Sequence, residues 1–498
     1  MIYNFNLGIG WASSGVEYAQ AYRASVLRKI NEKAKFIFSD MFPRDNLIDM
    51  TRNIGFEDDE IIWLYTYFTD QKLGPVTYSL DMLRETVKED YKYSRDGKIG
   101  KFNFEGENNF YRIYFTDKDS EMVHRVEIVS SGLLIRKDYY MSDRYFSEYY
   151  APLDGKAHMY LRRFFNRDGS VAYDEINDDD VVMYKFSDQV ICSKQDLIAY
   201  MVKSMNLTSK DIVIIDRATG QAQPILENKK DAHTGIVVHA DHFSEGATDD
   251  DYILWNNYYE YSFSMNKHID FYITATDDQN KLMMEQFDKY MGATPNIVTI
   301  PVGALDELKK PTKARKPHSL ITASRLASEK HIDWLIDVVV EAHKTISDIS
   351  LDIYGKGGAE KDLKEKIEQL EATEYIHLKG QHNLTNVYKR YEAYLSGSTS
   401  EGFGLTLMEA IGSGLPIIGF DVRYGNQNFI DNGKNGYIIP YSQGMEAGKR
   451  QKKMLDALIK LFTEDDLEAF SSHSYKKAEK YLSQEVEKRW KKLVEAQI

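Results

Sequence analysis

The sequence has one cysteine, Cys192, among its 498 residues. A single cysteine excludes a disulfide bond within the chain, and it favours a reducing compartment such as the cytoplasm. Cys192 ends a short apolar run over residues 190–192, a pattern that predicts a buried side chain serving only in packing. The folded state must therefore depend on packed cores, for which a hydrophobic content of 43% is ample.

Long apolar runs and an excess of basic residues are also missing. No run approaches the roughly 18 apolar residues of a membrane span, and residues 1–6 lack the basic flank and apolar core of a signal peptide. We expect a cytoplasmic protein, with peripheral association on the inner face of the cell membrane left open. The 63 basic residues are outnumbered by 77 acidic ones, and this charge of −14 argues against nucleic acid as a partner.

Residues 1–45 have the pattern of a strand, a glycine loop and a helix. The apolar stretch 2–7 is followed by the loop 8–14 and by a helical pattern from Gly15. This order is typical of the start of a Rossmann-like domain. Ser14 and Glu17 also have the spacing of a helix capping box, and a well-formed helix start is itself a site for anions.

Between about residues 50 and 185 the pattern changes to aromatic and β-branched runs. Two of these runs are 61–68 and 110–115, and tight-turn sequences such as 94–97 and 166–169 separate them. We interpret this region as an antiparallel β-meander inserted into the first α/β domain. Its aromatic side chains either pack one face of the sheet on the scaffold or offer an edge strand to a partner.

The alternation of strands and helices resumes after the meander and predicts two Rossmann-like lobes with a cleft between them. A basic stretch bracketed by prolines, 309–317, predicts the hinge. The predicted domains are 1–50 and 191–300 for the first lobe, 51–190 for the meander, 301–480 for the second lobe, and 481–498 for a terminal crossover helix. Strands are expected at 211–216, 235–239, 271–276, 319–323, 351–354, 375–378, 394–398, 415–420 and 436–439.

Two glutamates, Glu401 and Glu409, flank a glycine turn that opens a helix. The run 394–400 predicts a strand, so Glu401 lies at its carboxyl end, where α/β sheets bind ligands. Gly402 and Gly404 let the backbone approach a ligand, and the helix directs unpaired N–H groups at a group such as a diphosphate. Glu401 can then accept hydroxyls of a sugar, and Glu409 those of a ribose. The ordinary alternative is a structural turn with a surface glutamate.

Arg325 and Lys330 follow the predicted strand 319–323. Both can reach one diphosphate, because arginine supplies a forked donor and lysine a point charge. A leaving diphosphate needs such neutralisation as its negative charge builds up. The structural alternative is a surface ion pair between Arg325 and Glu329, with Lys330 solvated.

His239 ends an apolar strand of the first lobe, with Asp241 and His242 close behind. It is either a structural histidine or a donor to a sugar hydroxyl or the acceptor. Metal binding by these three residues is a weaker alternative, because the sequence shows no further ligands. The acidic runs 178–180 and 249–251 are interpreted as solvated loops.

The basic pair, the motif 401–409 and the two-lobe layout resemble the retaining GT-B glycosyltransferases of family 4. Within that family, the opening block 6–20, the inserted meander and the total length closely resemble the GtfA family, the O-GlcNAc transferase subunits of accessory-Sec systems. The resemblance extends over essentially the whole chain. The glutamate pair is common to family 4, whereas the opening block and the meander are far more specific.

This resemblance implies UDP-GlcNAc as donor and Ser/Thr hydroxyls of a serine-rich repeat adhesin as acceptor, in a Gram-positive cytoplasm. It also implies a homologous co-subunit, GtfB, which joins through the meander and aids acceptor binding. Transfer would retain the anomeric configuration by front-face attack, with a β-phosphate oxygen taking the acceptor proton, so that neither glutamate is a nucleophile. No metal ion is expected.

The resemblance assigns roles to residues that match the family motifs. One departure is that a loop often carrying Gly-Gly has Ser14-Gly15 here, which puts the donor contacts of this loop in question. UDP would contact Gly15, Val16, Glu17, Tyr18, Gln381 and His382, with Arg325 and Lys330 on the diphosphate and Glu409 on the ribose. GlcNAc would contact His239, Glu401, Gly402, Phe403 and Gly404. The catalytic residues would be Arg325, Lys330, Glu401 and His239.

Two other functions stay open. A poly(ribitol-phosphate) wall teichoic acid α-GlcNAc transferase shares the inserted meander, and it differs only in the acceptor. A sugar-nucleotide-binding subunit without turnover is the second alternative, although such a protein has no need of the complete set of glutamates and cations.

Overall fold

The computed structural model describes residues 1–11, 15–106, 108–178 and 181–497, and the chain separates into two compact units. The first unit comprises Met1–Val237, Asn257–Asp270 and Gln497–Ile498, and the second comprises Val238–Asn256 and Phe271–Ala496. Among the described helices, none combines the length and the apolar composition that a bilayer crossing requires.

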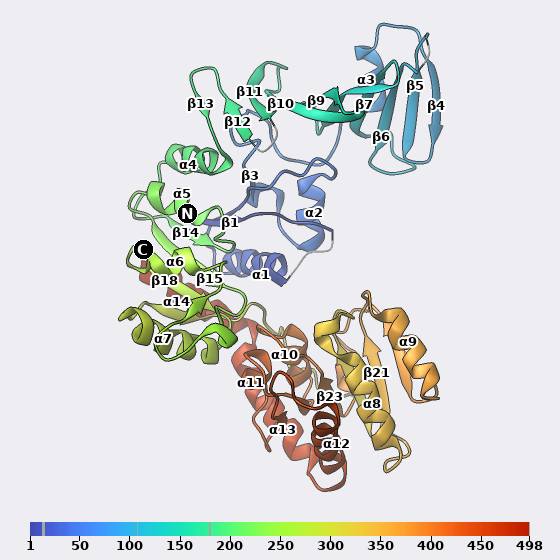
Figure 1. Ribbon diagram of the computed structural model, residues 1–498, viewed down its shortest axis with the longest axis vertical. Helices are drawn as coiled ribbons and strands as arrows, with labels where there is room; N and C mark the ends of the chain where they lie inside the picture. Colours follow the sequence, from blue (N-terminus) through green and yellow to red (C-terminus); the bar gives the residue numbers. More distant parts are fainter. Residues whose placement is uncertain (12–14, 107, 179–180, 498) are drawn as a thin grey trace. The chain divides into compact units, whose positions relative to one another are not determined.

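A parallel sheet forms the centre of the first unit (Figure 1). Its strand order within this unit is β15-β14-β1-β2-β3, so the chain order reverses beside β1. Most strand residues are buried, as expected for parallel strands with helices on both faces. The elements are β1 (Ile2–Asn6), α1 (Gly15–Lys29), β2 (Ala34–Phe38), α2 (Leu47–Ile54), β3 (Ile61–Trp63), α4 (Lys194–Ser204), β14 (Ile212–Ile215), α5 (Ala222–Asn228), β15 (His233–Val238) and α6 (Glu260–Ser264).

The inserted region is a ten-stranded antiparallel sheet in which each strand pairs with the next along the chain, from β4 to β13. This confirms the predicted meander. Helix α3 (Leu80–Thr86) packs its buried leucines on Phe102 and Ile113 of the sheet. The strands are β4 (Lys92–Asp96), β5 (Ile99–Asn103), β6 (Phe110–Phe115), β7 (Val123–Ser130), β8 (Leu133–Tyr140), β9 (Arg144–Leu153), β10 (Lys156–Phe165), β11 (Val171–Asp178), β12 (Val181–Lys185) and β13 (Val190–Ile191).

The sequence prediction that the aromatic run 61–68 belongs to the meander is wrong. Its first residues form β3, which pairs in parallel with β2, because a short, fully buried apolar run suits a parallel strand equally well. The rings that follow then pack against the meander. Tyr65 stacks on Phe164 at 5.8 Å between ring centroids, and its carbonyl accepts a hydrogen bond from Tyr173 at 2.7 Å. Here the aromatic face is used to join the meander to its scaffold.

The prediction that Cys192 is buried is also wrong, since its side chain is exposed. It directly follows the two-residue edge strand β13, in which Val190 points outward and Ile191 inward. The alternation along a strand therefore turns Cys192 to solvent.

The second unit is built on six parallel strands in the order β22-β21-β20-β23-β24-β25. The first strand in sequence, β20, lies at the centre, so the chain order reverses between β20 and β23. Each strand lies within two residues of its predicted position. The elements are β20 (Ser319–Ala323), α8 (Ile332–His343), β21 (Ser350–Tyr354), α9 (Glu360–Gln369), β22 (Ile376–Gly380), β23 (Ala393–Ser396), α10 (Leu405–Gly412), β24 (Ile417–Phe420), α11 (Gly425–Phe429), β25 (Gly436–Ile439), α12 (Ala447–Thr463), α13 (Leu467–Ala478) and α14 (Ser483–Gln497).

Helices cover both faces of this sheet. Leu320 and Leu351 belong to the core with α8, α9 and α12, whereas Ile321 belongs to the core with α10 and α13. Alternation along each strand thus supplies two separate cores. The same unit also contains β16 (Phe243–Ser244), β17 (Leu254–Trp255), β18 (Phe271–Thr274), α7 (Asp277–Met291) and β19 (Ile297–Thr299).

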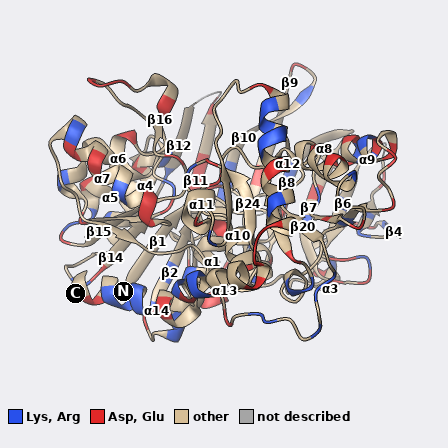
Figure 2. Cartoon of the chain, turned by 90° about the horizontal axis from the view of Figure 1, so that it is seen from below, with Lys and Arg blue, Asp and Glu red and all other residues tan. Residues whose placement is uncertain are grey.

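The lysine-rich C-terminal segment is helical, as predicted, and α12 is amphipathic. Met454 and Leu458 are fully buried on its inner side, while Lys449 and Lys452 are exposed. Acidic and basic residues are interspersed over most of the other elements (Figure 2). The basic run of α12 therefore has the solvated face expected for it.

A buried polar network lies at the reversal point of the first sheet. Arg23 of α1 donates two hydrogen bonds of 2.8 Å to Asp216, which follows β14, and both side chains are at most 3% exposed. Gln20 donates to the same carboxylate at 2.7 Å. Because this pair is out of water, each charge depends on the other.

We predict that Asp216→Ala lowers the free energy of unfolding of the first unit by about 3–5 kcal/mol, because the buried guanidinium of Arg23 loses its carboxylate. The exposed pair of Arg52 and Asp58 provides the matched control, and Asp58→Ala should cost about 1 kcal/mol or less. Hydrogen exchange of the β1 and β14 amides measures the loss of stability in both variants. Equal protection in the two variants would contradict the prediction.

Candidate functional site

The candidate site lies at the carboxyl edge of the parallel sheet in the second unit. All six strands run in one direction, so the loops that follow them meet at one edge. Arg325 and Lys330 follow β20, Gln381 follows β22, and Glu401 follows β23. Ligands of open α/β sheets bind where the strand order reverses, and here that point lies between β20 and β23.

Lys330 and Glu401 are in direct contact across the reversal point. Lys330 Nζ donates a 2.6 Å hydrogen bond to Glu401 Oε2, and Ser398 Oγ lies 3.3 Å from the same oxygen. The two charged side chains are 17% and 20% exposed, so water screens this ion pair less than a surface pair. The alternative in which Lys330 is simply solvated is therefore wrong.

A glycine at the end of β23 makes this contact possible. A Cβ at Gly397 would lie 2.7 Å from the carbonyl oxygen of Lys330, closer than real Cβ atoms approach. The loop carrying Lys330 thus packs on bare backbone, which brings its side chain to Glu401.

Arg325 is far more open, with a side chain 74% exposed. It forms the 2.8 Å pair with Glu329 that the structural alternative describes, and such an exposed pair contributes little stability. The loop that carries Arg325 packs against the residues that follow β21. Leu326 N donates to Lys356 O at 3.0 Å, and a Cβ at Gly357 would lie 2.2 Å from Leu326 O.

The turn 401–404 has the predicted form, with Gly404 at a φ of 85° and α10 beginning at Leu405. Among the described residues, no side chain caps the start of α10, so its first amides are available to a ligand. The backbone of Glu401 is fixed by the loop after β24, since Glu401 N donates to Arg423 O and Gly425 N donates to Glu401 O. The carboxylate is thus carried on a rigid turn.

His239, far away in sequence, lies beside this turn. A Cβ at Gly402 would be 3.1 Å from the carbonyl oxygen of His239, so their backbones are neighbours. Phe403 is buried against Phe429 and Tyr481, which restricts its contribution at the turn surface to the backbone. The structure therefore brings together the four sequence-predicted residues of the turn and His239.

Glu409, Gln381 and His382 complete the predicted set in this unit. Burial raises the pKa of the Glu409 carboxyl, and the Tyr388 hydroxyl opposes this rise. Gln381 and His382 are exposed, and the ring of His382 hydrogen-bonds Lys379 O at 2.7 Å. Its ring also meets that of Tyr354 edge-on at 5.9 Å between centroids.

The predicted donor residues 15–18 begin α1 in the first unit. Glu17 is buried, and its carboxylate accepts a 3.4 Å hydrogen bond from Asn6 and lies 3.5 Å from Arg217. Tyr18 is exposed. The predicted capping role of Ser14 falls outside the described residues.

His242 has a structural role. Its ring contacts Gln286 at 2.6 Å and the hydroxyl of Tyr424 at 3.1 Å, and burial lowers its pKa to about 4. The neutral ring thereby ties α7 to the loop after β24. Within the described ranges, no three His, Cys, Asp or Glu side chains are grouped to hold a metal ion.

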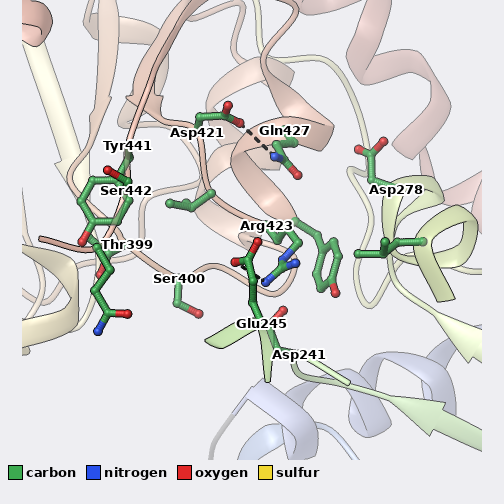
Figure 3. A pocket seen from close by; sticks show the side chains of 14 residues that line it. Asp241, Glu245, Asp278, Thr399, Ser400, Asp421, Arg423, Gln427, Tyr441 and Ser442 are labelled. Atoms are coloured by element: carbon green, nitrogen blue, oxygen red, sulfur yellow. Dashed lines mark hydrogen bonds and ion pairs between the residues drawn. The ribbon is translucent and has the colours of Figure 1, made fainter. Parts of the chain in front are cut away.

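A cavity of about 690 Å³ lies beside the turn 401–404, and no sequence motif indicates it (Figure 3). Asp421 and Arg423, which line it, directly follow β24 at the same sheet edge as Glu401. Examining the residues after every strand, and not only after those with a motif, would have indicated this part of the edge.

Comparisons with known proteins agree with this geometry. Residues 92–188 match the GtfA extended beta-sheet domain, and residues 305–468 match glycosyl transferases group 1. Two similar relatives are the UDP-N-acetylglucosamine–peptide N-acetylglucosaminyltransferase GtfA subunits of Streptococcus gordonii and Streptococcus pneumoniae serotype 4. Each is 50% identical over 99% of this chain, covering 98% and 99% of the relatives.

Solved structures give the same result. The pneumococcal O-GlcNAc transferase GtfA in complex with UDP and GlcNAc is 49% identical, with a TM-score of 0.90 over 100% of this chain and 98% of that chain. A GtfA/B complex contains a chain 50% identical, with a TM-score of 0.97 over 100% of this chain and 99% of that chain. TarM, 18% identical, shares the fold with a TM-score of 0.77 over 99% of this chain and 98% of that chain. The predicted resemblance is confirmed: the chain has the GT-B fold and belongs to the family of GtfA glycosyltransferase subunits.

Proposed function

We propose that this chain transfers GlcNAc from UDP-GlcNAc, with retention, to Ser/Thr hydroxyls of a serine-rich repeat adhesin. It acts as the catalytic subunit of a two-protein complex. The names of relatives that are 50% identical over the full length support this activity. The observation that carries the proposal is the Lys330–Glu401 contact at the reversal point of the sheet, since it joins a diphosphate-binding group to a sugar-binding group.

The two cations have complementary roles in this proposal. Lys330 is held in place before the donor arrives and supplies a localised charge to the diphosphate. Arg325, which is open to solvent, adds a forked donor as the leaving group gains charge. Together they supply the positive charge, so no metal is expected in the reaction.

The backbone of the turn 401–404 and the start of α10 supply the neutral donors. Gly402 and Gly404 allow the donor close to the main chain, and the uncapped amides of α10 point toward its phosphates. Glu401 accepts hydroxyls of GlcNAc, and His239 approaches the same sugar. Phe403 contributes through its main chain, because its ring is buried.

Residues farther along the edge are assigned to the nucleoside. Glu409 accepts the ribose hydroxyls, and Gln381 and His382 lie near uracil. On the first unit, we assign residues 15–18 to UDP, with Glu17 supporting the loop from below because its carboxylate bonds to Asn6.

The reaction proceeds without a protein nucleophile. The acceptor oxygen bonds to the anomeric carbon on the face that UDP leaves, as the carbon–oxygen bond to the β-phosphate breaks. The acceptor proton passes to a β-phosphate oxygen, so configuration is retained. Glu401 positions the sugar and carries no covalent intermediate.

The ten-stranded sheet is assigned to the partner, a homologous GtfB co-subunit. The chain that matches this protein with a TM-score of 0.97 comes from a GtfA/B complex, which supports a co-subunit as partner. We further propose a cytoplasmic location, with peripheral attachment to the inner face of the membrane.

The first test is transfer itself. The chain and its co-subunit, incubated with UDP-GlcNAc and a serine-rich polypeptide, should raise the acceptor mass in HexNAc steps. A poly(ribitol-phosphate) acceptor in a parallel reaction tests the teichoic acid alternative, and should gain no sugar. UDP binding by calorimetry without any transfer or hydrolysis would instead favour a non-catalytic subunit.

The second prediction concerns the ion pair. Lys330→Met and Glu401→Gln should each lower kcat/KM for UDP-GlcNAc by on the order of 100-fold, because each removes a group that faces the reacting centre. The exposed pair Lys361–Glu365 of α9, 3.7 Å apart, is the matched control. Lys361→Met and Glu365→Gln should stay within about twofold of the parent. Parent-like transfer by either site variant would refute the assigned roles.

A further inference from the structure

The cavity beside the turn 401–404 lies at the carboxyl ends of β23, β24 and β25, because residues that follow each of these strands line it. Figure 3 shows the lining side chains. Its volume of about 690 Å³ is in the range of sites that hold a sizeable ligand. Five parts of the second unit form its walls: the segment 241–245, α7, the loop after β23, the loop after β24 and the chain after β25.

The cavity adjoins the turn of the proposed donor site. Thr399 and Ser400 line it, and they directly precede Glu401. Lys330 and Arg325 follow β20, on the other side of β23 in the sheet. Neither of these cations lines the cavity. A molecule in the cavity would therefore lie next to the turn that carries Glu401 without lining up against either cation.

The lining is polar and strongly acidic. Four carboxylates, from Asp241, Glu245, Asp278 and Asp421, face one cation, Arg423. Arg423 donates to Glu245 at 3.1 Å, so its charge is already matched. Such a surface repels phosphates and carboxylates, whereas it offers acceptors to hydroxyl and amide N–H groups.

Asp241 is the lining carboxylate with a buried oxygen atom. Its Oδ1 atom is buried and has no hydrogen-bond partner among the described residues. Burial raises the pKa of this carboxyl, while Arg423 and Tyr424 oppose the rise. A donor group on a bound molecule could satisfy this oxygen.

We propose that this cavity binds the acceptor polypeptide, holding an uncharged, hydroxyl-rich stretch beside the residue that receives GlcNAc. It thereby selects protein over phosphate-rich acceptors. The inference rests on the proposed function, and it assigns a further specificity to the same enzyme: hydroxyls and backbone amides of the peptide donate to the carboxylate wall.

Filling the cavity tests its location. Ser442 lines it at the end of β25, and Ser442→Tyr should raise the acceptor KM by about tenfold or more. The KM for UDP-GlcNAc and the rate of its hydrolysis should not change. Ser347 is exposed at the amino end of β21, on the opposite edge of the sheet, so Ser347→Tyr is the matched control and should leave both KM values unchanged. These reactions use the full chain with its co-subunit.

Charge reversal tests the selectivity. The parent complex should use a neutral serine-rich peptide better than one with flanking aspartates, and Asp421→Lys should reduce this preference by about fivefold or more. Any of three results would overturn the proposal. These are an unchanged acceptor KM in Ser442→Tyr, an equal rise of the donor and acceptor KM values in that variant, or an unchanged peptide preference in Asp421→Lys. Absence of any transfer by the parent complex would instead count against the proposed function itself.

Discussion

The site depends on one contact between two strand ends, the ion pair of Lys330 with Glu401. The strand order reverses between β20 and β23, which leaves an opening at the carboxyl edge into which both loops project. Without the contact, a lysine and a glutamate at this edge would each be solvated side chains of little consequence. With it, a group suited to a phosphate and a group suited to a sugar are held 2.6 Å apart, and the remaining residues are arranged around them.

Glycines set this geometry more than side chains do. Gly397 lets the loop of Lys330 rest on β23, and Gly357 lets the loop of Arg325 rest on the residues after β21. Gly404 takes a left-handed conformation, with a φ of 85°, that begins α10 and exposes its first amides. The groups that we propose as catalytic are thus positioned by close backbone packing, and such rigidity suits the stabilisation of a developing charge.

Much of this could be predicted from the sequence, because alternating strands and helices fix which residues lie at the carboxyl edge. The position of Glu401 and the start of α10 follow from that pattern. The pairing of Lys330 with Glu401 could not, since it depends on side-chain direction across two strands. The run 61–68 was misplaced because apolar periodicity does not distinguish a buried parallel strand from an aromatic hairpin. Cys192 was misjudged because one step along an edge strand reverses exposure, and the cavity was missed because its walls come from distant segments.

The most direct measurement is a crystal structure of the chain with UDP-GlcNAc bound. The account predicts the diphosphate within hydrogen-bond distance of Lys330 Nζ and Arg325, with GlcNAc hydroxyls at Glu401 and the ribose at Glu409. The account would be contradicted by a donor bound away from the reversal point between β20 and β23, with no contact to Lys330 or Glu401 and their ion pair intact.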